Sequence, residues 1–214
     1  MENDVYENIL NKKLVAILRG LNYEDNFRVI ELLIECGFNN IEVTMNTENA
    51  LKIIDLSRKK YDKLSYIGAG TVKNEIDAKN SIDAGAQFLL SPNLSVKAIE
   101  YANSKNILIV PGVFTPTEIV NASVLGCRLV KLFPAGNVGY NYIKSIKGPL
   151  DDIKIMAVGG IDVNNVSDYL SNGTDAVGVG GKLIINDLVK NGDLNSLKQH
   201  ILRFKKQIEI NRSL

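Results

Sequence analysis

Leu129-Val130-Lys131-Leu132-Phe133 is the stretch that decides the fold, because it reads as a fully buried parallel strand with a lysine at its centre. An ammonium group in an apolar interior is costly to keep charged, so its pKa falls and the neutral amine becomes a nucleophile toward ketones. The alternative is a lysine at the strand's end that reaches water or pairs with a carboxylate. The rest of the sequence favours the buried, reactive amine.

Seven further strand-like runs flank this segment, and longer helical patterns separate them. The predicted strands are Leu14–Leu18, Asn40–Thr44, Tyr66–Gly68, Phe88–Leu90, Leu108–Val110, Leu129–Phe133, Lys154–Val158 and Ala176–Val179. Eight strands with crossovers predict an α/β fold, a closed (β/α)8 TIM barrel, rather than an open doubly wound sheet. No GxGxxG motif follows the first strand, which weakens a dinucleotide-binding interpretation. We expect one barrel domain over residues 1–214.

Helix signals between the strands agree with this repeat. A helix is predicted over Asn22 to Cys36, with apolar residues on one face, and another over Asn74 to Ala84, opened by an asparagine cap. Four glycines each follow a helical segment and precede a strand, where a left-handed residue ends the helix: Gly37, Gly85, Gly126 and Gly173. Their recurrence suggests four similar quarters.

Composition limits the partners. The chain has 25 basic and 24 acidic side chains, so no net field attracts nucleic acid or an anionic membrane, and a small molecule is the expected partner. No apolar stretch approaches the roughly 18 residues of a membrane span. The start Met1-Glu2-Asn3-Asp4 lacks the pattern of a signal peptide, which predicts a cytoplasmic protein. Cys36 and Cys127 are expected to be buried reduced thiols without a redox role.

The single histidine, His200, lies in a C-terminal amphipathic segment at helical spacing, so a helix-face position is expected. Zinc hydrolases and metal-dependent aldolases usually need two or three imidazoles. We therefore expect neither a metal site nor a cofactor.

Polar residues gather where the predicted strands end, which is where barrels place their catalytic groups. Strand alternation puts Glu42 and Thr44 on one face, and it puts Lys131 on the same face as Leu129 and Phe133. An inward Glu42 and Lys131 could form a structural ion pair, but barrel interiors are normally apolar, and a buried pair is often no better than hydrophobic residues. The pair fits a metal-free aldolase, in which Lys131 forms an iminium ion and Glu42 moves protons.

Three further features bear on binding. Arg19 ends the first predicted strand, where it either grips a carboxylate with two hydrogen bonds or forms a salt bridge at the rim. Gly159-Gly160 and Gly180-Gly181 follow the last two strands, where many barrels bind phosphate through backbone N–H groups. Tight turns are the alternative, but two glycine pairs after these two strands favour a phosphate site.

With these residues in place, the sequence resembles the 2-keto-3-deoxy-6-phosphogluconate aldolase family, which includes 4-hydroxy-2-oxoglutarate aldolases and 6-phosphogalactonate aldolases. The resemblance runs from about Leu14 to Leu183. Its motifs are Ala16-Ile17-Leu18-Arg19-Gly20, Ile41-Glu42-Val43-Thr44, Ile67-Gly68-Ala69-Gly70-Thr71-Val72, Ala84-Gly85-Ala86-Gln87-Phe88 with Ser91-Pro92, Val110-Pro111-Gly112-Val113, Val130-Lys131-Leu132-Phe133-Pro134 and Val158-Gly159-Gly160-Ile161.

The resemblance implies a class I aldolase that cleaves a 2-keto-3-deoxy-6-phospho sugar acid to pyruvate and glyceraldehyde 3-phosphate. Lys131 then matches the Schiff-base lysine and Glu42 the general acid/base. The other matched positions are Thr71, Pro92 and Phe133 in the pyruvate pocket, and the glycine pairs in the phosphate loops. The resemblance also implies a homotrimer.

The sequence departs from the family pattern at two positions. Asn46 stands where phosphogluconate-type members have an arginine on the substrate, and phosphogalactonate-type members can also have asparagine there. Lys182 stands where a serine often contacts phosphate, so its ammonium either binds the anion or turns to solvent.

Two rival functions remain at this point. A phosphosugar isomerase or epimerase would use the same barrel, glutamate and phosphate loops without a covalent intermediate. A non-catalytic binder of a phosphorylated acid would have no use for both Glu42 and Lys131. Within the aldolase interpretation, 4-hydroxy-2-oxoglutarate and a deaminated amino sugar acid remain possible substrates.

Overall fold

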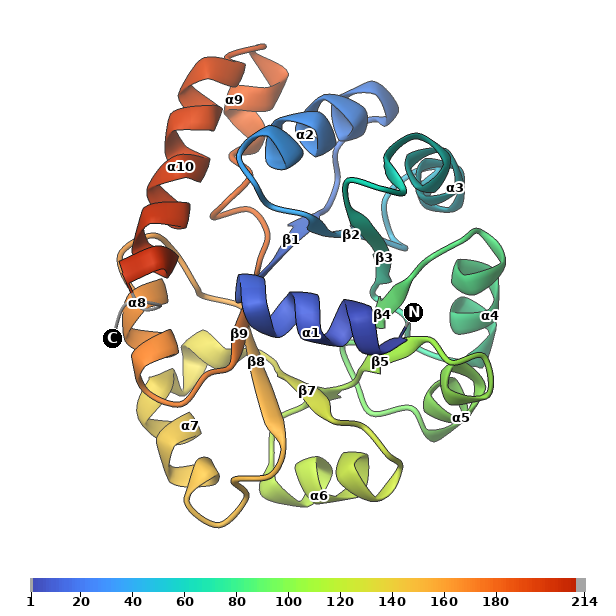
Figure 1. Ribbon diagram of the computed structural model, residues 1–214, viewed down its shortest axis with the longest axis vertical. Helices are drawn as coiled ribbons and strands as arrows, with labels where there is room; N and C mark the ends of the chain where they lie inside the picture. The colour runs from blue at the N-terminus through green and yellow to red at the C-terminus, as the bar shows by residue number, and fades with distance from the viewer. Residues whose placement is uncertain (1, 211–214) are drawn as a thin grey trace.

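A computed structural model describes residues 2–210 of the chain. Parallel strands form the centre of the molecule and helices surround them (Figure 1). The strands are β1 Leu14–Leu18, β2 Asn40–Thr44, β3 Tyr66–Gly70, β4 Phe88–Leu90, β5 Leu108–Val110, β6 Gly112–Val113, β7 Leu129–Leu132, β8 Lys154–Val158 and β9 Ala176–Val179. The helices are α1 Glu2–Lys12, α2 Tyr23–Glu35, α3 Ala50–Tyr61, α4 Glu75–Asp83, α5 Val96–Ser104, α6 Pro116–Val124, the 3₁₀ turn Ala135–Asn137, α7 Gly139–Lys147, α8 Val166–Ser171, α9 Asn186–Lys190 and α10 Leu194–Ile210.

The strands form one parallel sheet in the order β5-β4-β3-β2-β1-β9-β8-β7-β6, which curls into a nearly closed barrel. The prediction of eight strands was wrong by one, because Gly112–Val113 is a strand of its own. Pro111 separates it from β5, and proline has no N–H to donate to a neighbouring strand. β5 therefore pairs with β4 and β6 with β7, while the Pro111 carbonyl still accepts the Lys131 N–H at 2.8 Å.

Two strand ends also differ from their predicted positions. β3 continues to Gly70, because Thr44 and Gly70 remain in register with each other along β2 and β3. β7 stops at Leu132 instead of Phe133, although the Phe133 N–H still donates to the Val113 carbonyl at 3.1 Å. The next residue is Pro134, which cannot donate a further hydrogen bond and so ends the ladder.

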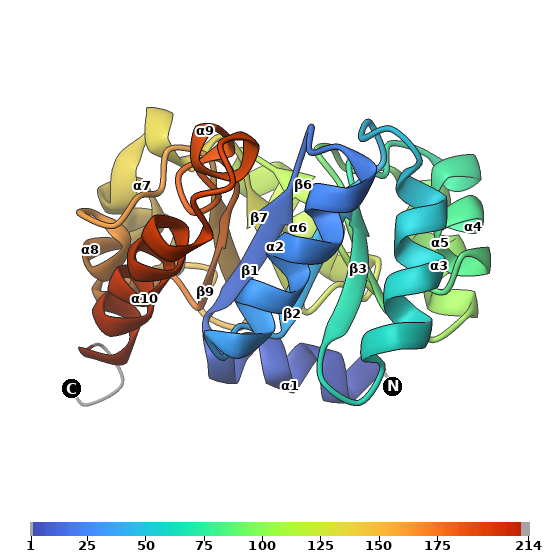
Figure 2. The same ribbon diagram turned by 90° about the horizontal axis from the view of Figure 1, so that it is seen from above.

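Alternating side chains divide the core into an inner and an outer layer. The outer layer lies between strands and helices and contains Leu14, Ala16 and Leu18 of β1. The inner layer contains Val15 and Ile17 of the same strand, together with side chains of β4, β5, β7, β8 and β9. Helix α1, which the sequence analysis did not predict, packs Val5, Tyr6 and Ile9 against this inner layer and covers the barrel end opposite the strands' carboxyl ends (Figure 2).

The predicted helix boundaries are confirmed. Asn22 and Asn74 cap α2 and α4 by accepting backbone N–H groups of Asp25 and Asp77. All four predicted helix-ending glycines are left-handed, with φ between +85° and +95°. No helix of residues 2–210 is both long enough and apolar enough to cross a membrane.

The two cysteines are buried and unpaired, as predicted. Burial raises the pKa of the Cys127 thiol to about 12, so this thiol stays protonated and unreactive at neutral pH.

Candidate active site

Lys131 and Glu42 both point into the barrel, as strand alternation predicted. Glu42 is fully buried and Lys131 is 3% exposed. Their strands, β7 and β2, lie four steps apart in the sheet, with β8, β9 and β1 between them. The two side chains therefore come from facing walls, and their charges interact across the interior.

The Glu42 carboxylate has no hydrogen-bond partner among residues 2–210. Burial raises the pKa of this carboxyl group, and the positive charges of Lys131 and Arg19 lower it by less. A carboxyl group that has no hydrogen-bond donors around it in an apolar interior holds its proton more tightly than a carboxyl group in water. The raised pKa suits Glu42 to give a proton as well as to take one.

The Lys131 amine has the opposite shift. Burial lowers its pKa; Glu42 raises it by a smaller amount and Arg19 lowers it further. The Phe133 ring lies with its centroid 5.3 Å from the Lys131 Nζ, a cation–π contact that favours the charged form. Burial has the larger effect and increases the fraction of neutral, nucleophilic amine.

Gly70 makes the space for the Glu42 carboxylate. A Cβ atom added at Gly70 would lie 1.5 Å from Glu42 Oε1 and 2.2 Å from its Cδ, so only glycine fits at this position while Glu42 keeps its rotamer. The next residue, Thr71, has φ of +61°, a conformation that costs a β-branched residue free energy. Strain of this kind is often found at functional sites, and the binding role of Thr71 stays a prediction.

Pro92 is held near the Lys131 strand. The hydroxyl of Ser91 donates to the Asn93 carbonyl at 2.7 Å, which fixes the turn around Pro92. The Pro92 carbonyl group occupies the place where a side chain of Gly112 would begin, 2.3 Å from an added Cβ. Gly112 of β6 pairs with Lys131 of β7, so Pro92 packs against the strand next to the one that carries the Lys131 amine.

A cavity of about 190 Å³ opens at the carboxyl ends of the strands. It brings together Arg19, Lys131, Phe133 and both glycine pairs, and Lys182 also lines it. Glu42, Thr71, Pro92 and the exposed Asn46 lie outside its lining. The predicted site residues therefore divide into a set around the cavity and a set on β2 to β4 beside it.

The loop after β8 is anchored by its carbonyl groups. The Gly159 carbonyl accepts the Gly136 N–H at 2.8 Å, and the Gly160 carbonyl accepts the Asn165 amide at 2.9 Å. Gly159 and Gly160 both have positive φ, and an added Cβ at Gly160 would lie 2.8 Å from the Gly136 Cα. Glycine is therefore required here by backbone conformation and by close packing.

The N–H groups of these loops remain available. Those of Gly160, Ile161, Gly181 and Lys182 donate to no backbone or side-chain acceptor in the described part of the chain. All four residues line the cavity, so the loops present donors for an anion.

Sequence reasoning missed the glycines that make room for the site: Gly70, Gly112 and Gly136. Glycine inside a strand is a sign that another group approaches the backbone closely, but the predicted strands ended at Gly68 and Val110, so this signal was not read at Gly70 or Gly112. Gly136 carried no such signal, because its partner Gly160 is brought beside it only by the fold.

Comparison with known proteins identifies the family. The model for KDPG and KHG aldolases matches residues 5–200. A protein of Rhizobium meliloti strain 1021, named probable 2-dehydro-3-deoxy-6-phosphogalactonate aldolase, is 37% identical over 175 residues, which cover 81% of this chain and 82% of its own. The chain belongs to the KDPG and KHG aldolase family. The resemblance stated from its motifs is thus confirmed.

Solved structures agree with this assignment. The native KDPGal structure has a TM-score of 0.86 at 28% identity and covers 94% of this chain and 96% of its own. The KDPG aldolase of Legionella pneumophila, with pyruvate captured at low pH as a covalent carbinolamine intermediate, has a TM-score of 0.84 at 25% identity and covers 91% of this chain and 94% of its own. Aldolases of this family are carbon–carbon lyases.

Proposed function

We propose that this KDPG/KHG aldolase family member is a class I aldolase, which cleaves a 2-keto-3-deoxy-6-phospho sugar acid to pyruvate and glyceraldehyde 3-phosphate. The observation that carries the proposal is the facing pair of Lys131, with a lowered pKa, and unpartnered Glu42, with a raised pKa. Such opposed shifts at one site are typical of a nucleophile and its acid/base partner.

In the proposed reaction the neutral Lys131 amine attacks the C2 ketone of the substrate. Glu42 gives a proton to the carbinolamine hydroxyl, and water leaves to form the iminium ion. Glu42, now a carboxylate, takes the C4 hydroxyl proton, the C3–C4 bond breaks to release the aldehyde, and the electron pair of that bond moves into the enamine. Protonation of the enamine at C3 and hydrolysis of the imine release pyruvate and regenerate the amine.

The cavity suggests where the substrate's two anionic groups bind. The proposal assigns the carboxylate to Arg19, whose guanidinium can form two parallel hydrogen bonds, with Thr71, Pro92 and Phe133 around the pyruvate unit. It assigns the phosphate to the N–H groups of the Gly159-Gly160 and Gly180-Gly181 loops, with Lys182 beside them.

Asn46 bears on the C4 configuration. Two relatives, from Rhizobium meliloti and from Escherichia coli K12, are named as phosphogalactonate aldolases and are 37% and 30% identical to this chain. Relatives named as phosphogluconate aldolases are 32% to 33% identical. We propose relaxed or galactonate-type preference, because Asn46 replaces the arginine of the phosphogluconate type.

The proposal extends to the assembly. We propose a closed (β/α)8 barrel in which β5 and β6 form one strand interrupted at Pro111, and a cytoplasmic homotrimer. Apolar side chains exposed on three successive helices support an interface there: Ile76 on α4, Val96 on α5, and Val120 and Val124 on α6.

The test is release of pyruvate from purified protein supplied with the two C4 epimers of the 6-phospho substrate and with their dephosphorylated analogues. We expect higher kcat/KM for the phosphorylated compounds, because the loop N–H groups otherwise lack their anion. Strict preference for the gluconate epimer would contradict the reading of Asn46. Isomerised substrate without pyruvate would favour the phosphosugar isomerase alternative.

A further inference from the structure

Two threonine hydroxyls form a buried hydrogen-bond chain beside Arg19. Thr44 is fully buried and Thr47 is 5% exposed. The Thr44 hydroxyl contacts the Leu18 carbonyl at 3.2 Å and the Thr47 hydroxyl at 3.0 Å, and the Gly20 N–H donates to Thr47 Oγ1 at 3.3 Å.

Only one direction of donation satisfies the whole chain. The Leu18 carbonyl can only accept, so Thr44 gives its hydrogen to that carbonyl. Thr47 must then donate to Thr44 Oγ1, while its own oxygen accepts the Gly20 N–H. Thr47 is therefore the link that joins the Gly20 peptide to Thr44.

This chain holds the backbone on both sides of Arg19. The Leu18 carbonyl belongs to the peptide group before the Arg19 Cα, and the Gly20 N–H belongs to the peptide group after it. Gly20 has φ of +68°, so the backbone turns directly after Arg19. Fixing both peptide planes fixes the direction in which the Arg19 side chain leaves the backbone.

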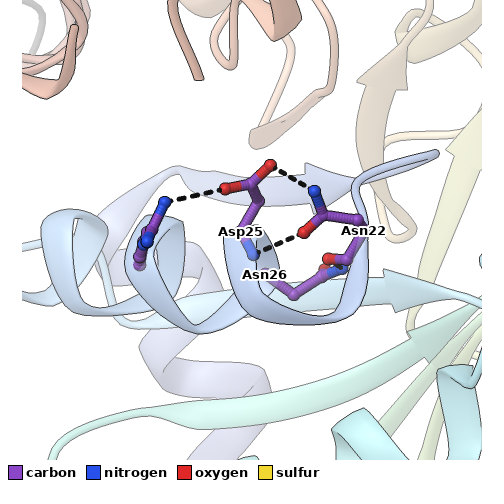
Figure 3. Close-up of polar contacts among 4 residues, drawn as sticks. Asn22, Asp25 and Asn26 are labelled. Carbon is purple, nitrogen blue, oxygen red and sulfur yellow. Dashed lines mark hydrogen bonds and ion pairs between the residues drawn. The ribbon is translucent and has the colours of Figure 1, made fainter. Parts of the chain in front are cut away.

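The far end of the same loop is anchored at the start of α2. The buried Asn26 amide donates to the Leu21 carbonyl at 3.1 Å and to the Asn22 carbonyl at 2.8 Å. Asn22 caps the helix by accepting the Asp25 N–H at 2.8 Å, and the Asn22 amide donates to the Asp25 carboxylate at 2.7 Å (Figure 3). The segment from Leu18 to Asn22 is thus held at both ends.

We propose that Thr47 is a positioning residue that aims Arg19 at the carboxylate of the substrate. This inference rests on the proposed function, in which Arg19 is the carboxylate ligand. A long arginine side chain loses rotamer freedom when it binds, and a backbone that is already fixed adds no further loss of freedom to that cost. The same link ties Arg19 to the turn that carries Asn46, because the Thr47 N–H also donates to the Thr44 carbonyl at 2.8 Å.

The test compares Thr47→Val, which keeps the shape and removes the hydroxyl, with Thr47→Ser, which keeps the hydroxyl. The readout is the pyruvate concentration that half-saturates borohydride trapping. We expect Thr47→Val to raise it roughly 3- to 30-fold, as expected for one or two lost hydrogen bonds, and Thr47→Ser to stay within about threefold of wild type. Thermal unfolding verifies the fold, and Thr47→Ala serves if the valine variant does not fold.

A double-mutant cycle separates positioning from general damage. If Thr47 acts through Arg19, Thr47→Val should change half-saturation by less than about twofold in an Arg19→Ala background. Thr174→Val is the matched control, because Thr174 is equally buried but precedes β9 at the opposite end of the barrel. An equal effect with and without Arg19, a similar effect of Thr174→Val, or failure of serine to restore binding would overturn the role of Thr47.

The trapping assay also distinguishes this inference from the proposed function. Wild-type protein that traps no pyruvate would overturn the proposed function, and the role of Thr47 with it. If wild type is labelled and Thr47→Val needs the same pyruvate concentration for half-saturation as wild type, only the role of Thr47 would be overturned.

Discussion

Gly70→Ala should disable the acid/base while leaving the nucleophile in place. A methyl group at residue 70 would lie 1.5 Å from Glu42 Oε1, 2.2 Å from Cδ and 2.6 Å from Cγ, so the carboxyl group must move. Gly70 lies in β3 and pairs with Thr44, so the backbone has little freedom to absorb the clash. The expected result is a loss of about 10² to 10⁴ in kcat, the usual contribution of a positioned acid/base.

The cost in stability should be smaller than the cost in catalysis. Overpacking a core by one methyl group costs roughly 1–3 kcal/mol, which corresponds to a fall in Tm of roughly 2–12 °C for a domain of this size. The loss in rate corresponds to about 3–5 kcal/mol of transition-state stabilisation. A folded, nearly inactive variant is therefore expected.

The assay is steady-state pyruvate release, with thermal unfolding alongside. Gly148→Ala is the control, because an added Cβ there meets only the Ser145 carbonyl oxygen at an ordinary 3.5 Å. In a Glu42→Gln background, Gly70→Ala should lower kcat little further, since both changes remove the same group. Near-normal turnover of Gly70→Ala, or fully additive losses, would refute the assignment of Glu42.

Three further predictions concern protonation, metal and phosphate. Burial raises the folded-state pKa of Glu42 above the ordinary value of about 4.3, so wild type should lose stability relative to Glu42→Gln as the pH rises between these two values. Urea unfolding at several pH values measures this difference in stability, and a difference that does not change with pH would contradict the raised pKa. EDTA should not lower activity, since one histidine cannot assemble the usual metal site, and activity restored by zinc or magnesium would oppose this. Lys182→Ala should lower kcat/KM for the phosphorylated substrate by about 1–3 kcal/mol and spare the dephosphorylated analogue; equal losses on both would exclude a phosphate contact.

The sequence predicted the layout of the fold because its signals are local. Apolar runs, helix caps such as Asn22 and Asn74, and left-handed glycines each report on a few neighbouring residues, and the structure has them where expected. Two of the errors involve proline: the strand β6, which was not predicted, follows Pro111, and Pro134 ends β7 one residue before the predicted end. Both prolines are evident in the sequence, but the strand predictions did not take into account that proline cannot donate a hydrogen bond to a neighbouring strand.

The reactive pair could also be anticipated, because two charged residues stood at inward positions of apolar strands. What the sequence could not supply was the space around them. The packing of the Glu42 carboxylate against Gly70, the contact of Gly136 with Gly160 and the hydroxyl chain of Thr47 all join residues from different strands or loops. Such contacts depend on register and side-chain direction, which only the folded chain determines.

Trapping with pyruvate and borohydride tests the central claim most directly, because the imine is an obligatory intermediate of the proposed reaction. Reduction should leave a covalent adduct that peptide mass analysis maps to Lys131. Labelling should proceed at neutral pH, since burial lowers the pKa of this amine, and Lys131→Ala should abolish it. No adduct on wild type, or an adduct that persists in Lys131→Ala, would contradict the Schiff-base mechanism.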